Sequence, residues 1–202
     1  MSNLLKPIVQ WARPILLIGA GLFIPFAVIL AWLAQADIDN YNVLVAALDA
    51  GLRSLLFLAA VGLMARLFDH GNWLPRVSAL LAALGVIGAL VFAVGALAEY
   101  AGLVGRPAWV NFLIPMMFAG FIGLILAGIA VLRTNELPSL IGMLFLAPPL
   151  IFGLQFAIMP LLPTWSILFF IGAQAATMLA IGLQLPSEQT TSPKVSQQPS
   201  SA

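Results

Sequence analysis

The sequence predicts an all-α membrane protein, a polytopic transmembrane bundle of about six spans with its N-terminus and C-terminus in the cytoplasm. Three observations predict it. Of the 202 residues, 62% are apolar and only 7% are charged, whereas a soluble domain carries about 25% charged residues. The apolar residues occur in runs of roughly twenty, the length that a helix needs to cross about 30 Å of hydrocarbon. Lys and Arg, finally, lie mainly in the segments that fall on one side of the membrane, as is typical of cytoplasmic loops.

The second span is the least obvious of the six. Only twelve residues separate Arg53 from Arg66, which makes about 18 Å of helix and is too short to cross. The second helix must therefore begin earlier, and it then includes Asp49 and Arg53. The spans are expected at residues 14–34, 43–67, 77–98, 110–132, 140–159 and 165–183.

These six spans form one transmembrane domain, residues 1–185. The composition changes after Leu185 to PSEQTTSPKVSQQPSSA, which is rich in Ser, Gln and Pro. Such a segment has no apolar surface to bury, so residues 186–202 are expected to be a disordered polar tail.

The orientation follows from the distribution of basic residues. Arg53 and Arg106 lie on the outer side if the N-terminus is inside and the number of spans is even. The other six basic residues are then cytoplasmic: Lys6, Arg13, Arg66, Arg76, Arg133 and Lys194. The expected location is the cell membrane, crossed several times.

The stretch GLILAGIAVLRTNELPSLIGMLFLAPPL, residues 123–150, has a recurring pattern. A Gly-rich span ends in Arg, a short turn carries Pro, and Leu and Gly open the next span. It resembles uncharacterised bacterial six-helix integral membrane proteins, of the kind grouped as domains of unknown function. The resemblance implies a bacterial membrane protein, in the inner membrane, and assigns no functional residue.

Several chemistries lack the residues that they need. Cysteine is absent and His70 is the single histidine, which excludes disulfides, iron–sulfur clusters and bis-histidine haem within one chain. His70 falls in a cytoplasmic turn, and no intramembrane base is available to activate a serine nucleophile. The net charge is +1 without a basic cluster, which argues against nucleic acid binding. We therefore expect no enzyme, no metal and no cofactor.

Asp49 and Arg53 are the charged residues inside a span, where charges are unfavourable and often functional. Their i,i+4 spacing places them on one helical face, in the order favoured for an ion pair. One interpretation is a polar feature that faces an interior cavity open to the outside. The other, which we favour from the sequence, is an interfacial pair in which Arg53 extends to the outer headgroups.

Three prolines lie in the middle of spans, where proline removes a backbone hydrogen bond and kinks a helix. They are Pro25 in the first span and the pair Pro148 and Pro149 in the fifth. Kinks of this kind are commonly structural, but broken helices also build substrate sites in transporters.

Gln155, Gln174 and Thr177 are the polar side chains deep in the last two spans. Buried amides in membranes usually hydrogen-bond to neighbouring helices, and contact with a substrate is the alternative for the two glutamines. Small residues recur every fourth position in three spans and predict packing faces within or between chains: Gly85, Ala89, Ala93; Ala119, Gly123, Ala127; Gly172, Ala176, Ala180.

The sequence therefore favours a non-enzymatic accessory or structural membrane subunit. Its expected partners are the lipid bilayer, and further copies of itself or a larger membrane complex. The alternative is a small oligomeric transporter or channel with a midplane site at the kinked first and fifth helices.

Overall fold

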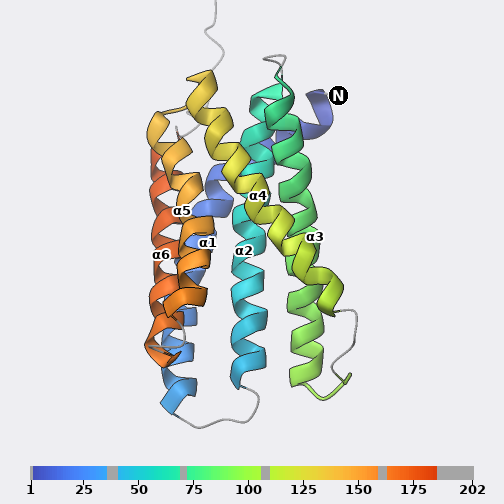
Figure 1. Cartoon of the computed structure of the whole chain (residues 1–202), viewed down its shortest axis with the longest axis vertical. Coiled ribbons are helices and arrows are strands. Elements are labelled where there is room, and N and C mark those ends of the chain that lie inside the picture. The colour runs from blue at the N-terminus through green and yellow to red at the C-terminus, as the bar shows by residue number, and fades with distance from the viewer. Residues whose placement is uncertain (1, 36–40, 69–71, 106–109, 159–162, 186–202) are drawn as a thin grey trace, which may run out of the picture.

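The computed structural model describes residues 2–35, 41–68, 72–105, 110–158 and 163–185. This part of the chain is helical and contains no strand, which confirms the predicted all-α class for the described residues. The helices are α1 (Ser2–Gln35), α2 (Tyr41–Arg66), α3 (Trp73–Tyr100), α4 (Val110–Thr134), α5 (Ser139–Ile158) and α6 (Pro163–Gln184) (Figure 1). Each contains most or all of one expected span, and α1 is longer than expected because it begins at Ser2.

The helices alternate in direction along the bundle axis. The start of α1, the ends of α2 and α4 and the end of α6 lie at the upper end of the view (Figure 1). Each helix packs against the next one in the chain, and α6 also packs against α1, so the six helices close a ring. α4 crosses diagonally in front of α2 and α3 in this view and contacts both.

The ends of α3 show why this helix begins and stops where it does. The Asn72 side chain accepts a hydrogen bond from the Leu74 backbone N–H at 3.1 Å and caps the first turn. At the other end Gly102 has φ +70°, a conformation that glycine adopts without a Cβ penalty. The N–H of Leu103 then reaches the carbonyl of Ala98 at 2.9 Å, as in a Schellman motif.

Small residues bring α3 and α4 into backbone contact. A Cβ added to Gly120 would lie 2.8 Å from the Gly85 Cα and 2.7 Å from the Phe57 ring. One added to Gly123 would lie 2.6 Å from the Ala82 backbone N. Close to this contact, the buried Ser78 hydroxyl donates to the Gly123 carbonyl at 2.8 Å. The two helices are thus joined by close packing and by one buried hydrogen bond.

The small-residue stripes differ in where they face. Gly85 of the α3 stripe and Gly123 of the α4 stripe lie in the contact between these helices, and Ala89 and Ala127 are fully buried. In the α6 stripe, Ala176 is exposed, and Gly172 and Ala180 are half-buried. The buried side of α6 is formed instead by other residues: Ile171, Gln174, Ala175, Met178 and Ile181.

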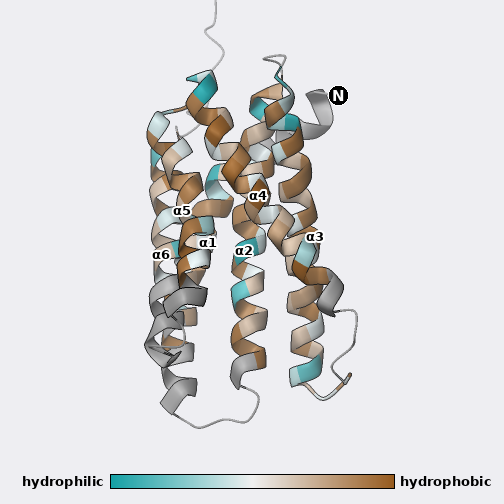
Figure 2. Cartoon of the chain, in the orientation of Figure 1, coloured by the Kyte–Doolittle hydropathy of each residue, from teal (hydrophilic) through white to brown (hydrophobic). Residues whose placement is uncertain are grey.

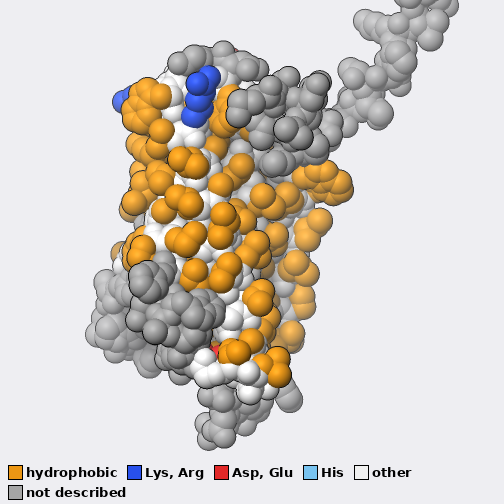
Figure 3. All heavy atoms as spheres, turned by 90° about the vertical axis from the view of Figure 1, so that its right-hand side faces the viewer, with side chains coloured by type: hydrophobic (Ala, Val, Ile, Leu, Met, Phe, Trp, Pro, Cys, Tyr) orange, Lys and Arg blue, Asp and Glu red, His pale blue; other side chains and the backbone are white. Residues whose placement is uncertain are grey.

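The outer surface of the bundle is apolar between its two ends. Leu80, Ile87, Leu90 and Val94 of α3 are among the exposed large hydrophobic side chains. Apolar residues predominate along the described helices, while polar residues lie toward the ends and in the middle part of α2 (Figure 2). On the face turned toward α3, hydrophobic side chains cover most of the described surface and arginine side chains lie near the upper end (Figure 3). A surface of this kind fits hydrocarbon as solvent.

Three helical segments are long and apolar enough to cross a membrane, as judged over the described residues: Val43–Arg66, Trp73–Tyr100 and Leu113–Thr134. This finding indicates a membrane protein. The described apolar stretches of α1, α5 and α6 are shorter: Trp11–Phe26, Ser139–Leu154 and Ile171–Gln184. The number of six spans therefore stays a prediction.

Candidate functional site

Asp49 and Arg53 form an ion pair inside the bundle. The Arg53 Nε–H donates to Asp49 Oδ1 at 3.0 Å, and the second guanidinium nitrogen, Nη2, pairs with Asp49 Oδ2. The Arg53 side chain is 4% exposed and that of Asp49 is 18% exposed. This two-point contact matches the planar fork of arginine to a carboxylate, which a lysine cannot do.

The guanidinium group of Arg53 also lies over two aromatic rings from other helices. Its Cζ is 4.7 Å from the ring centroid of Phe152 on α5 and 5.5 Å from that of Phe121 on α4. The two rings stack with centroids 4.4 Å apart, and Phe57 of α2 meets Phe121 edge to face at 5.4 Å. We call Asp49, Arg53, Phe57, Phe121 and Phe152 the Arg53 cluster.

The Arg53 cluster connects three helices through one cation. The negative face of an aromatic ring attracts a cation, most strongly where water is excluded. The Arg53 side chain therefore turns inward, toward α4 and α5, and not outward along α2. This inward arrangement differs from the interfacial one that the sequence favoured, in which Arg53 would reach the outer headgroups.

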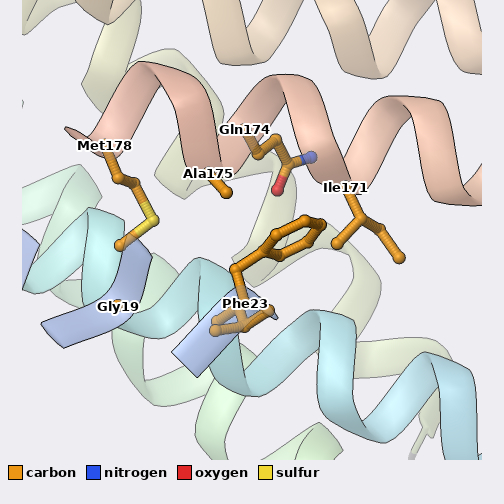
Figure 4. A pocket seen from close by; sticks show the side chains of 7 residues that line it. Gly19, Phe23, Ile171, Gln174, Ala175 and Met178 are labelled. Atoms are coloured by element: carbon orange, nitrogen blue, oxygen red, sulfur yellow. The ribbon is translucent and has the colours of Figure 1, made fainter. Parts of the chain in front are cut away.

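A small hollow lies between α1, α2 and α6 beside Gln174 (Figure 4). Its cavity volume is about 10 Å³. Gln174 is 5% exposed, and its Nε2 has no hydrogen-bond partner among the described residues. The lining, which we call the Gln174 pocket, comprises Gly19, Phe23, Leu52, Ile171, Gln174, Ala175 and Met178.

The Gln174 pocket lies where the hydrophobic core is interrupted. Met178 belongs to the main core, whereas Ile171 belongs to a separate cluster with Phe26 and Val45, against which Phe23 packs. The pocket takes side chains from both. A polar side chain at this junction therefore faces a gap and not a partner.

Thr177 and the three predicted prolines lie within helices. Thr177 is buried and donates its hydroxyl to the Ala173 carbonyl of its own helix at 2.8 Å, so it does not join the pocket. α1 includes Pro25, and α5 continues through Pro148 and Pro149. The kinks at these prolines stay predictions.

Some predicted features lie outside what the structure describes. They are the Gln155 side chain, His70, and the polar tail of residues 186–202. Within the described part of the chain, no group of three or more His, Cys, Asp and Glu residues is placed to hold a metal ion.

Sequence reasoning missed the aromatic half of the Arg53 cluster. Phe121 and Phe152 are two of the 13 phenylalanines in an apolar chain, and nothing local to them indicates a cation partner on another helix. It also missed Pro115 inside α4 and the hydrogen bond from Ser78 to Gly123. For Ser78 a signal existed, because hydroxyls in membrane helices often bond across to a neighbouring helix.

Comparison of the chain with models of protein families, with curated proteins and with solved structures finds no match. The features of the structure that bear on function are the Arg53 cluster, the Gln174 pocket and the apolar exterior.

Proposed function

We propose that the chain is a six-span membrane protein that acts as a non-enzymatic structural or accessory subunit of a membrane assembly. The observation that carries this proposal is that the intramembrane cation, Arg53, is fully engaged in contacts within the chain. Arg53 is held by Asp49 on its own helix and by rings from α4 and α5. A cation with these contacts holds α2 against α4 and α5, and it is not free to bind a solute or a coupling ion.

The proposed orientation places the upper end of the bundle, as drawn in Figure 1, in the cytoplasm. Arg66 ends α2, Arg76 lies in the first turn of α3 and Arg133 lies in the last turn of α4. All three therefore belong to the same end of the bundle, as the positive-inside rule requires.

Reporter fusions test this topology directly. Fusions after Asn40, Gly71 and Gly105 should report outside, inside and outside in that order. A fusion after Pro186 should report inside. External signals from both the Asn40 and the Pro186 fusions contradict the six-span arrangement, because an even number of crossings would then lie between these two points instead of five.

The outward side of α6 supports an association with another helix. Ala176, in the middle of its small-residue stripe, is exposed, and such stripes allow helices to approach closely. Extraction into native lipid nanodiscs followed by mass measurement tests this. A subunit should appear in a complex of fixed composition, heavier than the 21.4 kDa of one chain. A single chain in every preparation would refute the subunit role.

In the same experiment, Ala176→Leu should weaken the complex, because a bulky side chain blocks close approach. Leu80→Ala is the control, since Leu80 is an exposed leucine of a different helix, α3. The complex should survive this second change.

A small transporter is the second candidate, and one observation favours it. The Gln174 amide is unpartnered beside a hollow at mid-helix depth, and α5 contains Pro148 and Pro149. Flux assays in proteoliposomes distinguish the two functions. A structural subunit leaves the leak of ions and small neutral solutes at the level of empty vesicles. A saturable flux that Gln174→Leu abolishes establishes the transporter instead.

A further inference from the structure

We propose that Arg13, at the end of the seam where α1 and α6 pack together, binds the phosphate group of an anionic phospholipid. The ligand is a lipid of the bilayer and not a phosphate from solution. This site goes beyond the structural role proposed above and depends only on the membrane location of the bundle.

The position of Arg13 is set by the packing of α1 on α6. Leu17, one turn further along α1, touches α6, since a Cβ added to Gly182 would lie 2.9 Å from Leu17 Cδ2. Residues i and i+4 share a helical face, so Arg13 lies on the same side of α1 as Leu17. The two helices run in opposite directions (Figure 1). Arg13 is therefore one turn closer to the end of the bundle, level with the last residues of α6 at Gln184.

The guanidinium group of Arg13 has no counter-charge from the described chain. The side chain is half-buried, and its Nε has no hydrogen-bond partner among the described residues. No carboxylate in the described part of the chain pairs with it. A cation that is partly removed from water without a partner is unfavourable, so an anion from outside the chain would stabilise it.

An external anion reaches the terminal nitrogens of Arg13 and not Nε. Nε is buried, whereas Nη1 and Nη2 are not among the buried unpartnered atoms and make no hydrogen bond to a described residue. These two nitrogens carry four of the five N–H donors of an arginine. They form a fork that matches two phosphate oxygens. Burial of Nε limits the movement of this fork.

The surroundings place the fork at the level of lipid headgroups. Trp11 is 58% exposed and lies two residues, about 3 Å along the axis, from Arg13. Exposed tryptophans are typical of the membrane–water interface. Along the same face of α1, away from this end, Leu17 is followed by Ile24, which is 70% exposed. A lipid held by its phosphate at Arg13 can lay its acyl chains over these apolar side chains, whereas a free phosphate ion cannot use them.

The charges at this end of the bundle favour a headgroup with a net negative charge. Arg66, Arg76 and Arg133 lie at the same end, on α2, α3 and α4, and among the described residues there Glu136 is the acidic one. The sequence has no run of basic residues, so it is the fold that brings these arginines to one end. A zwitterionic headgroup would add a further cation beside them, and an anionic headgroup adds none.

Native mass spectrometry of the full chain in detergent tests the proposal. The protein is titrated with phosphatidylglycerol or with phosphatidylcholine of the same acyl chains, which share the phosphodiester and differ in net charge. The first phosphatidylglycerol should bind about tenfold more tightly than the first phosphatidylcholine, as expected for a charge-assisted hydrogen bond. Equal affinities overturn the proposal.

Two arginine variants locate the site. Arg13→Gln should lower the affinity for the first phosphatidylglycerol about tenfold. Arg76→Gln is the matched control, since it removes the same charge from an exposed arginine at the same end, and it should lower the affinity less than about twofold. Equal losses in the two variants mean that only the general charge of this end attracts the lipid. No loss in Arg13→Gln means that water solvates the guanidinium group. Either result refutes the site.

Arg13→Lys guards against misfolding of Arg13→Gln, because it keeps the charge and an apolar stem. It lacks the planar fork, so it should bind phosphatidylglycerol about threefold more weakly than the unmodified protein. Unchanged affinity in Arg13→Lys refutes the assignment to the guanidinium group.

The soluble headgroup separates a lipid from a free phosphate. Glycerophosphoglycerol, added as its ammonium salt, carries the phosphodiester of phosphatidylglycerol without acyl chains. It should neither bind detectably nor displace the lipid. If it binds at the same concentration and displaces the lipid, the ligand is a soluble phosphodiester and the proposal is overturned. These titrations depend neither on the reporter fusions nor on the mass of an assembly, so failure of the subunit role and failure of this site are distinguishable.

Discussion

Replacing Arg53 with methionine removes the charge of the Arg53 cluster but keeps an apolar side chain of similar length. Methionine fills irregular space and contacts aromatic rings favourably, so part of the packing on Phe121 and Phe152 survives. The change leaves Asp49 without its partner, but that side chain is 18% exposed and thus partly solvated. We expect Arg53→Met to lower the free energy of unfolding by about 2 kcal/mol.

The reverse change, Asp49→Asn, leaves a more deeply buried charge behind. Arg53 is 4% exposed, so its guanidinium loses the carboxylate without gaining water. Breaking a buried ion pair from one side lowers stability by roughly 3–5 kcal/mol. We expect a value near about 3 kcal/mol, because the rings of Phe121 and Phe152 still stabilise the cation.

The double variant decides whether the two residues act as a pair. With both charges removed, no buried charge is left without a partner. Asp49→Asn combined with Arg53→Met should therefore lower the free energy of unfolding by about 2.5 kcal/mol, about half the sum of the two single changes. The assay is unfolding of the detergent-solubilised protein with increasing mole fraction of sodium dodecyl sulfate, followed by loss of helical circular dichroism.

Two further variants control this cycle. Arg53→Lys keeps the charge but not the planar fork, so it should not restore the wild-type stability. Arg76→Met removes an exposed arginine at the start of α3 and should change stability by less than about 0.5 kcal/mol. Small and strictly additive effects of Asp49→Asn and Arg53→Met, each under about 1 kcal/mol as for an exposed pair, would refute the buried cluster.

Three other expectations follow from the packing and are checked in the same unfolding assay. Gly120→Ala should lower stability by about 2 kcal/mol, because the new methyl group overlaps the α3 backbone. Gly51→Ala, with nothing within 4 Å of the added Cβ, should be neutral or slightly stabilising, and an equal loss in both variants contradicts the close contact. Ser78→Ala should cost about 0.6 kcal/mol, the typical value of a hydrogen bond between membrane helices. Gln174→Leu should raise stability by up to about 1 kcal/mol, since it removes a buried amide nitrogen without a partner, and a clear loss of stability would show that this nitrogen has a partner.

Helix number and approximate helix positions were predictable from the sequence because they depend on local properties. In an apolar solvent every backbone N–H and C=O must be satisfied within the segment, so long apolar runs form helices. The runs are long enough to recognise, and the connections between them are short. Asp49 and Arg53 were likewise predictable as a pair on one face, since i,i+4 spacing sets that relation within a single helix.

Contacts between helices were not predictable in the same way. Phe121 and Phe152 come from α4 and α5, far along the chain from Arg53 on α2, and their approach depends on how α4 crosses the bundle. The sequence favoured an arginine that extends to the headgroups because it shows no partner for the cation apart from Asp49. Two stacked rings from other helices supply the additional attraction that keeps Arg53 inside.

The sequence by itself indicated an apolar, membrane-like surrounding, the approximate helices and the pairing of Asp49 with Arg53. These features depend on composition and on the spacing of residues within one helix. The tertiary structure alone decided which polar groups are satisfied. Ser78 meets a carbonyl of α4, whereas Gln174 faces a gap between two clusters of the core. The difference arises because a helix fixes the direction of its own side chains, while the neighbour that each one meets depends on how separate helices pack.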